Sequence, residues 1–364
     1  MTWHPQPSVS AIVPARNEEL NIARSVLSLA AQPEILEIIV VDDQSEDRTG
    51  EILEALEKQY PVLRVVLVDD LPAGWVGKPH ALAAGARLAR GEWLLFTDAD
   101  AEHRPGSLRA LLAKAEDARA DLLSVSPGQK LTTWWEKSVI PLVFTQLAEL
   151  YPFHRVSDPR SPVAAANGQY ILVRRATYES VGGHAATPEA VLEDVDLARR
   201  VKSSSGRLVF LPGAEWIETR MYHSFSEMRT GWTKNLFLLY RRDVHTVRRA
   251  VGKLLGHWAV GFDWLVISAW LLCALWLRLE RRHPLGLAGW LPILLGLELL
   301  SILLVLQERY RRALRRSGFP TRLAKYFFLG APLVSLLLLE SVWAYRRRGL
   351  IHWKGRVYSV GQPR

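Results

Sequence analysis

The chain has 364 residues, of which 49% are hydrophobic and 23% charged, with a formal net charge of +9 and a single cysteine. Its apolar content excludes a disordered tail, and one cysteine cannot form the internal disulfides of a small secreted domain. The charge is uneven, because residues 230–364 hold 22 Lys and Arg against 6 Asp and Glu, whereas residues 1–229 have a balance of −7.

The first hundred residues predict alternating strands and helices. Strands are expected at residues 9–15, 35–43, 62–69 and 93–100, and helices between Asn17 and Leu29, at 49–59 and at 79–90. We expect Asn17 to cap the first helix, and Ser45 or Asp47 to cap the second. This alternation predicts a doubly wound, largely parallel sheet, and ligands of such sheets bind beyond the carboxyl ends of the strands.

Acidic side chains follow two of these strands. Asp42 and Asp43 end the second strand, where a turn and a helix cap would explain them equally well. Asp98 and Asp100 follow the fourth strand, and two carboxylates at this spacing can converge on a hard divalent cation whose remaining positions a diphosphate would fill. Solvated loop acids are the alternative for the second pair taken alone.

Three apolar segments follow in the last third of the chain, at residues 258–277, 286–306 and 323–345. Each has about the 20 residues needed to cross a bilayer core, with Trp and Tyr toward the ends and arginines in the connections. The excess positive charge therefore lies beside membrane segments, which argues against nucleic-acid binding. A buried helical core is the alternative. Cys273, in the first segment, is explained as a packing or lipid-facing residue.

The number of crossings follows from the charge of the tail. Three crossings from a cytoplasmic start would place the basic tail outside, against the positive-inside rule. The third segment is the weakest candidate, because Gly330-Ala331-Pro332 interrupts it and Glu340 adds a charge. We therefore expect two crossings and a cytoplasmic tail. Residues 1–10 lack the pattern of a signal peptide, so we expect the first 250 residues to stay in the cytoplasm.

Six motifs, in order over roughly residues 8–232, resemble those of the inverting family 2 glycosyltransferases. They are Pro14-Ala15-Arg16-Asn17-Glu18-Glu19, VVDDQSEDRTG at 40–50, Gly77-Lys78-Pro79-His80-Ala81, Thr97-Asp98-Ala99-Asp100, Ala166-Asn167-Gly168-Gln169-Tyr170 and Leu192-Glu193-Asp194-Val195-Asp196-Leu197-Ala198. The resemblance implies an α/β fold of the GT-A type, a Rossmann-like, mainly parallel mixed sheet flanked by helices, followed by C-terminal transmembrane helices.

The resemblance also implies a role for individual positions. Donor nucleotide binding is implied for Pro14, Arg16, Glu18, Asp43, Lys78 and Asp98, and binding of Mg²⁺ or Mn²⁺ for Asp98 and Asp100. On the acceptor side it implies Gly168, Gln169, Tyr170 and Trp232. Asp194, beside Glu193, would be the general base that takes a proton from the acceptor hydroxyl, and one in-line displacement would invert the sugar.

One departure from the family bears on the product. Many members that build long polymers carry a QxxRW motif, but residues 228–232 read Met-Arg-Thr-Gly-Trp, with Met and Gly at the Gln and Arg positions. Arg229 or Lys234 would then be left to face the diphosphate. The apolar segments are also too few for a polysaccharide channel. Transfer of a single sugar is therefore expected.

The acceptor is expected to be a lipid. Residues 133–153 form an apolar, aromatic segment, either a helix on the bilayer surface or a core helix. Three parts of the chain resemble bacterial lipid-directed members of the carotenoid, hopanoid-associated and ceramide glucosyltransferase types. They are this segment, the motif at 166–170 and the closing Trp353-Lys354-Gly355-Arg356-Val357-Tyr358. The closing motif would contact anionic headgroups or contribute to the active site.

The expected protein is a membrane-anchored, metal-dependent glycosyltransferase that uses a nucleotide sugar, with a UDP-sugar expected, and acts on a lipid hydroxyl at the cytoplasmic membrane. Sugar transfer to polyprenyl phosphate and a non-catalytic membrane scaffold are the alternatives. Residues 1–230 would form the catalytic domain, 231–257 an interfacial connection, 258–345 a membrane region with two or three helices, and 346–364 a basic tail.

Overall fold

The computed structural model describes residues 8–281 and 287–359, which form two compact units. The first takes in the described residues of 1–130, 150–231 and 350–361, and the second those of 131–149 and 232–349. Each unit is therefore assembled from segments that are separated in the sequence.

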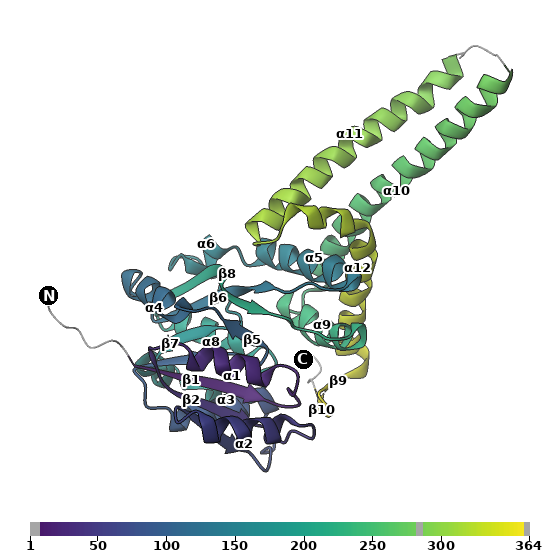
Figure 1. The fold of residues 1–364 in the computed structure, drawn as a ribbon. Helices are drawn as coiled ribbons and strands as arrows, with labels where there is room; N and C mark the ends of the chain where they lie inside the picture. The colour runs from purple at the N-terminus through teal and green to yellow at the C-terminus, as the bar shows by residue number, and fades with distance from the viewer. Residues whose placement is uncertain (1–7, 282–286, 360–364) are drawn as a thin grey trace. The chain divides into compact units, whose positions relative to one another are not determined.

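The first unit is built on a mixed sheet of eight strands in the order β3-β2-β1-β4-β7-β6-β8-β5 (Figure 1). The strands are β1 Val9–Ala15, β2 Ile35–Asp42, β3 Leu63–Leu67, β4 Trp93–Phe96, β5 Ala101–His103, β6 Leu122–Gln129, β7 Ile171–Arg174 and β8 Leu208–Thr219. Strands β3, β2, β1 and β4 are parallel, β7 runs antiparallel to β4 and β6, and β5 runs antiparallel to β8. The predicted GT-A type of fold is confirmed.

Helices cover this sheet. They are α1 Ile22–Ala30, α2 Thr49–Gln59, α3 Gly77–Leu88, α4 Ser107–Asp117, α6 Phe153–Ser157, α7 Arg175–Ser180, η1 Gly183–Ala186 and α8 Glu193–Ser203. Helix α1 buries Ile22, Val26 and Leu29 in the core that β1 and β2 share, which is the face that their helical spacing predicts.

The register of the parallel strands places the loops of the site together. Ala15, at the end of β1, pairs with Asp42, at the end of β2, and Ile12 of β1 pairs with Phe96, at the end of β4. The chain therefore leaves all three strands at one edge of the sheet, where parallel strands offer a ligand-binding crevice.

One predicted helix cap is wrong. Helix α1 begins at Ile22, and Asn17 lies in the preceding loop at a φ of 52°. The Asn17 carboxamide instead accepts a hydrogen bond of 2.8 Å from the Glu46 amide, which joins the loops after β1 and β2. Of the two caps predicted for α2, Asp47 accepts from the Thr49 amide at 3.0 Å, whereas the Ser45 hydroxyl accepts from the Asn17 amide.

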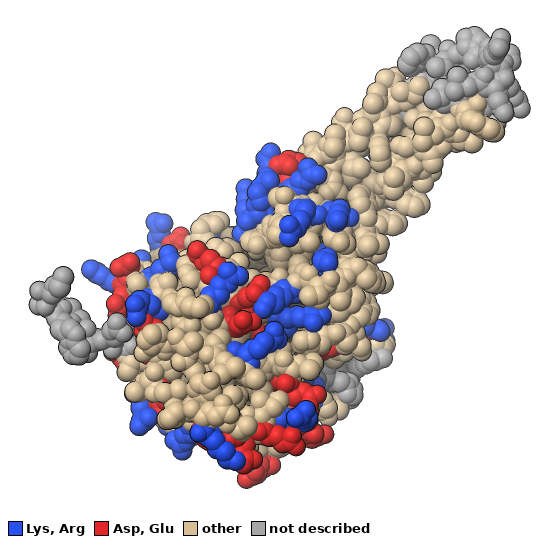
Figure 2. Space-filling view, viewed as in Figure 1, with Lys and Arg blue, Asp and Glu red and all other residues tan. Residues whose placement is uncertain are grey.

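The second unit is helical. It contains most of α5 Trp134–Leu150, the end of α9 Phe225–Leu239, and α10 Val244–Arg281, α11 Leu287–Arg316, η2 Thr321–Tyr326, α12 Phe327–Trp343 and a π-helical turn at Ala344–Arg348. Helices α10 and α11 lie side by side (Figure 1). Arginines gather near the end of α11, at 309–316, and the described part of the α10–α11 pair beyond them shows no charged residue on the face seen in Figure 2.

Two stretches of the described chain are long and apolar enough to cross a membrane, Val244–Ala274 and Thr321–Arg347. The predicted segment 286–306 forms the first half of α11, except residue 286, which lies outside the described residues. The third predicted segment is not interrupted, because α12 runs through Pro332. Gly330 allows α12 to cross α5 closely, since a Cβ there would lie 2.1 Å from the Ser138 carbonyl oxygen.

Helix α5 is a core helix rather than a surface helix, which decides between the two predictions for residues 133–153. Val139, Ile140, Leu142 and Val143 are at most 1% exposed, although Trp134 is 55% exposed. Burial of the apolar face removes it from contact with lipid, so this helix offers little surface to a bilayer.

Candidate active site

The loops after β1 and β2 are held together by Arg16. Its guanidinium donates to the backbone carbonyl oxygens of Asp43 and Gln44, both at 2.7 Å, and pairs with the Glu46 carboxylate at 3.1 Å. Pro14 lies two residues before Arg16, in β1, and pairs with Val41 of β2. Asp43 is buried at this edge of the sheet, being 5% exposed. The loops after β1 and β2 therefore hold Arg16 and Asp43 next to each other at the carboxyl ends of the strands.

Lys78 joins the two acidic motifs. It lies in the first turn of α3, and its Nζ is 2.7 Å from Asp98 Oδ1 and 2.7 Å from Glu193 Oε1. Burial opposes the charge of Lys78, but the surrounding carboxylates outweigh it and hold its pKa well above the ordinary value. The ammonium group is therefore permanently charged and bridges the loop after β4 to the start of α8.

Asp100 is an unusual buried carboxylate. Burial raises its pKa to about 7, and the charges of Asp98 and Glu18 act in the same direction. Its Oδ1 is buried without a hydrogen-bond partner among the described residues, and its Oδ2 is 3.4 Å from the Gln169 amide nitrogen. An oxygen left unsatisfied beside a second carboxylate is chemically suited to a hard divalent cation.

The protein offers such a cation only part of its coordination. Within residues 8–281 and 287–359, no group of three or more His, Cys, Asp or Glu side chains is placed to hold a metal ion. Asp98 and Asp100 therefore fit a cation that takes its other oxygen ligands from a substrate, such as a diphosphate. They do not form a closed set of protein ligands.

Asp194 is fixed in the first turn of α8. Its Oδ2 accepts from the Gly168 amide at 2.9 Å, and its Oδ1 accepts from the Val195 amide at 2.7 Å. Burial raises the pKa of Asp194 to about 7, and the neighbouring Glu193 charge adds to the effect. A Cβ on Gly168 would lie 2.9 Å from Lys78 Nζ, so a larger residue there would displace the Lys78 ammonium group. The arrangement holds a carboxylate whose proton affinity suits a general base.

Residues 10–181 match the family model described as Glycosyl transferase family 2. This chain carries a family 2 glycosyltransferase domain. A curated relative, 4,4'-diaponeurosporenoate glycosyltransferase of Staphylococcus aureus strain MRSA252, is 25% identical over 363 residues, which are 98% of this chain and 89% of the relative. The corresponding protein of strain USA300 is 24% identical over 362 residues. These findings confirm that the protein is a glycosyltransferase.

A solved structure is also similar. A mannosyltransferase from Pyrobaculum calidifontis, in complex with GDP-Man and Mn²⁺, is 17% identical, covers 94% of this chain and 87% of its own, and superposes with a TM-score of 0.49.

The glycosyltransferase domain also contains a hairpin from the far end of the chain. Strands β9 Leu350–Trp353 and β10 Arg356–Ser359 are antiparallel, and the turn residues Lys354 and Gly355 both have positive φ, as a tight two-residue hairpin turn requires. Lys354 donates to the Arg16 carbonyl oxygen at 2.7 Å and forms an ion pair with Glu18.

Arg356, on the same hairpin, forms a two-pronged ion pair with the Asp43 carboxylate and donates to Gln44 Oε1 at 2.8 Å. Of the two predictions for the closing motif, these contacts favour a contribution to the site. Lys354 and Arg356 are absent from the predicted donor residues. The Lys354-Gly355 pair indicates a turn in the sequence. The contact between Arg356 and Asp43 could not be predicted from a local pattern, because the two residues are 313 positions apart.

The acceptor-side residues are distributed over both units. Gln169 is buried, and its carbonyl oxygen accepts from the Thr97 hydroxyl at 2.8 Å. Tyr170 is fully buried in the hydrophobic core, with its ring 5.7 Å from that of His103. Trp232 belongs to the second unit, where it is buried with its ring edge-to-face with Phe144. Gly168 touches the predicted base, since its amide donates to Asp194 Oδ2.

Proposed function

We propose that this glycosyltransferase moves a single sugar from a nucleotide sugar to the hydroxyl group of a lipid, with inversion at the sugar. The observation that carries the proposal is the Lys78 bridge, which links Asp98, on the donor side, to Glu193, next to the Asp194 carboxylate. Asp194 then takes the proton from the attacking hydroxyl, on the opposite side of the sugar from the departing diphosphate. A single displacement needs no covalent nucleophile.

The donor side is assigned from the loop contacts. Arg16, Pro14 and Asp43 would line the pocket for the nucleobase and ribose, and Lys78 would lie beside the diphosphate. Asp98 and Asp100 would hold Mg²⁺ or Mn²⁺, and the unsatisfied Oδ1 of Asp100 supports this assignment. When bound, the metal supplies positive charge where negative charge develops on the leaving nucleoside diphosphate.

The lipid acceptor and the membrane anchor rest on two observations. The curated relatives are named for 4,4'-diaponeurosporenoate, a name whose ending denotes a carboxylate. Two stretches of this chain are long and apolar enough to span a bilayer. We propose that the catalytic unit lies on the cytoplasmic face of the membrane, with the basic segments at the anionic leaflet.

The charge of the acceptor separates this proposal from its closest alternatives. A carboxylate or a polyprenyl phosphate is already ionised and needs no base, whereas a hydroxyl does. The two backbone amides that fix Asp194, and its raised pKa, favour the hydroxyl.

The test uses the full chain in lipid nanodiscs with radiolabelled UDP-sugars and three acceptors that share one apolar chain: an alcohol, a carboxylic acid and a monophosphate. We expect sugar to appear on the alcohol, and extraction of the labelled lipid measures it. Preferential labelling of the monophosphate, or of the carboxylic acid, would assign the acceptor to an ionised class and contradict the proposal.

Lys354 and Arg356 are also proposed to belong to the donor site. Arg356→Gln should raise the donor KM about tenfold with little change in kcat, because a charge-assisted hydrogen bond contributes about 1.5–3 kcal/mol. Initial rates against donor concentration measure it. Arg48→Gln is the matched control, since it removes the same charge from an exposed side chain of the same unit. A lower KM in Arg356→Gln would mean that the hairpin competes with the nucleotide.

A further inference from the structure

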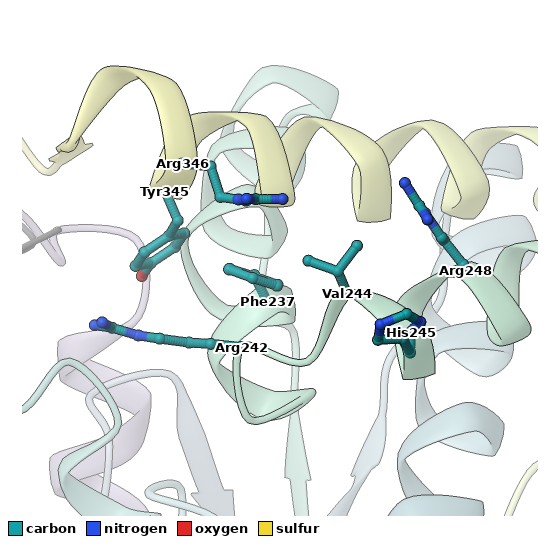
Figure 3. A pocket seen from close by; sticks show the side chains of 7 residues that line it. All are labelled: Phe237, Arg242, Val244, His245, Arg248, Tyr345 and Arg346. Atoms are coloured by element: carbon teal, nitrogen blue, oxygen red, sulfur yellow. The ribbon is translucent and has the colours of Figure 1, made fainter. Parts of the chain in front are cut away.

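A cavity of about 410 Å³ lies in the second unit, where α9 passes into α10 and α12 ends. Its lining residues are Phe237, Arg242, Val244, His245, Arg248, Tyr345 and Arg346. Figure 3 shows the side chains from the α9–α10 segment facing those from the π-helical turn that follows α12 across this space. Three arginines and a histidine line it, and no carboxylate occurs among the described lining residues.

The nearest acid in the sequence is already engaged by the start of α10. The Asp243 carboxylate accepts from the His245 amide at 2.9 Å, from the Thr246 amide at 3.2 Å and from the Thr246 hydroxyl. Hydrogen bonds hold its pKa below the ordinary value, the one from the Thr246 hydroxyl most of all. Asp243 therefore caps the start of α10, where these three hydrogen bonds engage its carboxylate.

The walls of the cavity are fixed before any ligand arrives. The Tyr345 hydroxyl donates to the Lys234 carbonyl oxygen at 2.7 Å, and the Phe237 amide donates to the Ser341 hydroxyl at 2.9 Å. Arg242 lies over the Tyr345 ring at 5.7 Å. Its φ is 56°, and a non-glycine residue in this region costs about 1 kcal/mol, so packing holds the arginine in place against a local preference.

An apolar stripe on α12 leads to this cavity. Leu329, Leu336 and Trp343 follow one another at intervals of seven residues and are 53%, 62% and 47% exposed, so they share one face of the helix. Arg346 comes one turn after Trp343. The two candidate membrane spans also begin and end here, since Val244 starts the first and Arg347 ends the second.

We propose that this cavity binds the phosphate group of an anionic phospholipid, with the acyl chains along the stripe. Guanidinium groups bind phosphate oxygens in pairs, and Val244 and Phe237 supply the apolar contact below the headgroup. The site does not depend on the sugar-transfer assignment, because none of its residues belongs to the carboxylate cluster of the first unit.

The test compares the full chain with two triple variants that each remove three positive charges. The cavity variant is Arg242→Gln with Arg248→Gln and Arg346→Gln, and the control is Arg309→Gln with Arg311→Gln and Arg316→Gln, on the exposed end of α11. Thermal unfolding and lipid titration are measured in non-ionic detergent with added phosphatidylglycerol, phosphatidylcholine or inorganic phosphate.

We expect phosphatidylglycerol to raise the unfolding temperature of the native chain and the control, and to bind the cavity variant at least about tenfold more weakly. A variant with lysine at all three cavity positions should recover part of the binding, because it restores the charge without the paired guanidinium donors, and this recovery distinguishes lost charge from failed folding. An equal loss of phosphatidylglycerol binding in the control variant would mean that the net charge of the protein, and not the cavity, determines binding. That result would overturn the proposal. An equal response to inorganic phosphate would overturn the assignment to a lipid.

Discussion

Replacement of Asp194 by Asn should lower turnover by about 10²–10⁴-fold while the donor still binds within a few-fold of the native affinity. Asparagine keeps the size of the side chain and can still accept from the Gly168 amide, but it cannot take a proton from the acceptor hydroxyl. Single-turnover rates and equilibrium binding of the nucleotide sugar measure the two quantities separately. Unchanged turnover would remove Asp194 as the base.

The pH dependence of turnover in the native enzyme is a second test of Asp194 as the base. Burial, with Glu193, raises the pKa of Asp194 to about 7, and only the ionised form is a base. The rate should therefore be constant above that pH and fall about tenfold for each unit below it. At saturating Mn²⁺, which keeps Asp100 ionised, the residual rate of Asp194→Asn should lose this dependence, since the titrating base is gone.

The matched control is Asp196→Asn, in the same turn of α8. The Asp196 carboxylate accepts from the Thr187 hydroxyl at 2.6 Å and pairs with Arg200 at 2.9 Å. Its loss should affect stability more than turnover. If both variants lost turnover equally, the effect of Asp194 would be attributable to the start of the helix.

Asp100→Asn should weaken metal-dependent donor binding by about 100-fold or more, because it removes an anionic oxygen from a divalent cation beside a diphosphate. Titration of the nucleotide sugar at fixed Mn²⁺ measures the change, and a chelator should abolish native turnover. Metal-independent turnover in the native enzyme would overturn the role. Since burial raises the pKa of Asp100 to about 7, metal affinity should also fall as protons compete below that pH.

The stability of the Asp100→Asn variant shows whether weaker donor binding comes from the lost carboxylate or from misfolding. The folded-state pKa of Asp100 lies above the ordinary value, so its ionised form destabilises the folded state as the pH rises from about 4 to 7. The metal-free Asp100→Asn variant should therefore unfold no more easily than the native chain above pH 7. Glu102→Gln, which removes a carboxylate paired with Lys130 on β5, should leave donor binding unchanged.

The parallel part of the sheet could be predicted because strand and helix periodicities are local. The strand expected at 9–15 is β1, and the helix expected at 49–59 is α2, with the same bounds. The cap at Asn17 failed for a tertiary reason. Its carboxamide reaches the Glu46 amide across the sheet edge, and α1 begins five residues later than the predicted cap.

The acidic residues of the site could be found from their position at strand ends, but their mutual contacts could not. Nothing in the spacing of Lys78, Asp98 and Glu193 says that one ammonium group touches both carboxylates. Tyr170 illustrates the reverse case, because it stands in a recognisable motif and yet its side chain is fully buried in the core. Motifs fix the backbone path, while packing decides which side chains reach a cleft.

By itself, the sequence determined the type of fold, the family 2 motifs with their order, and the uneven charge, because each depends on residue types at short spacing. Only the tertiary structure decided that α5 is buried, that three arginines from two segments line one cavity, and that Arg356 meets Asp43. Contacts of this kind join residues up to hundreds of positions apart. They depend on how helices and strands pack, which no local pattern specifies.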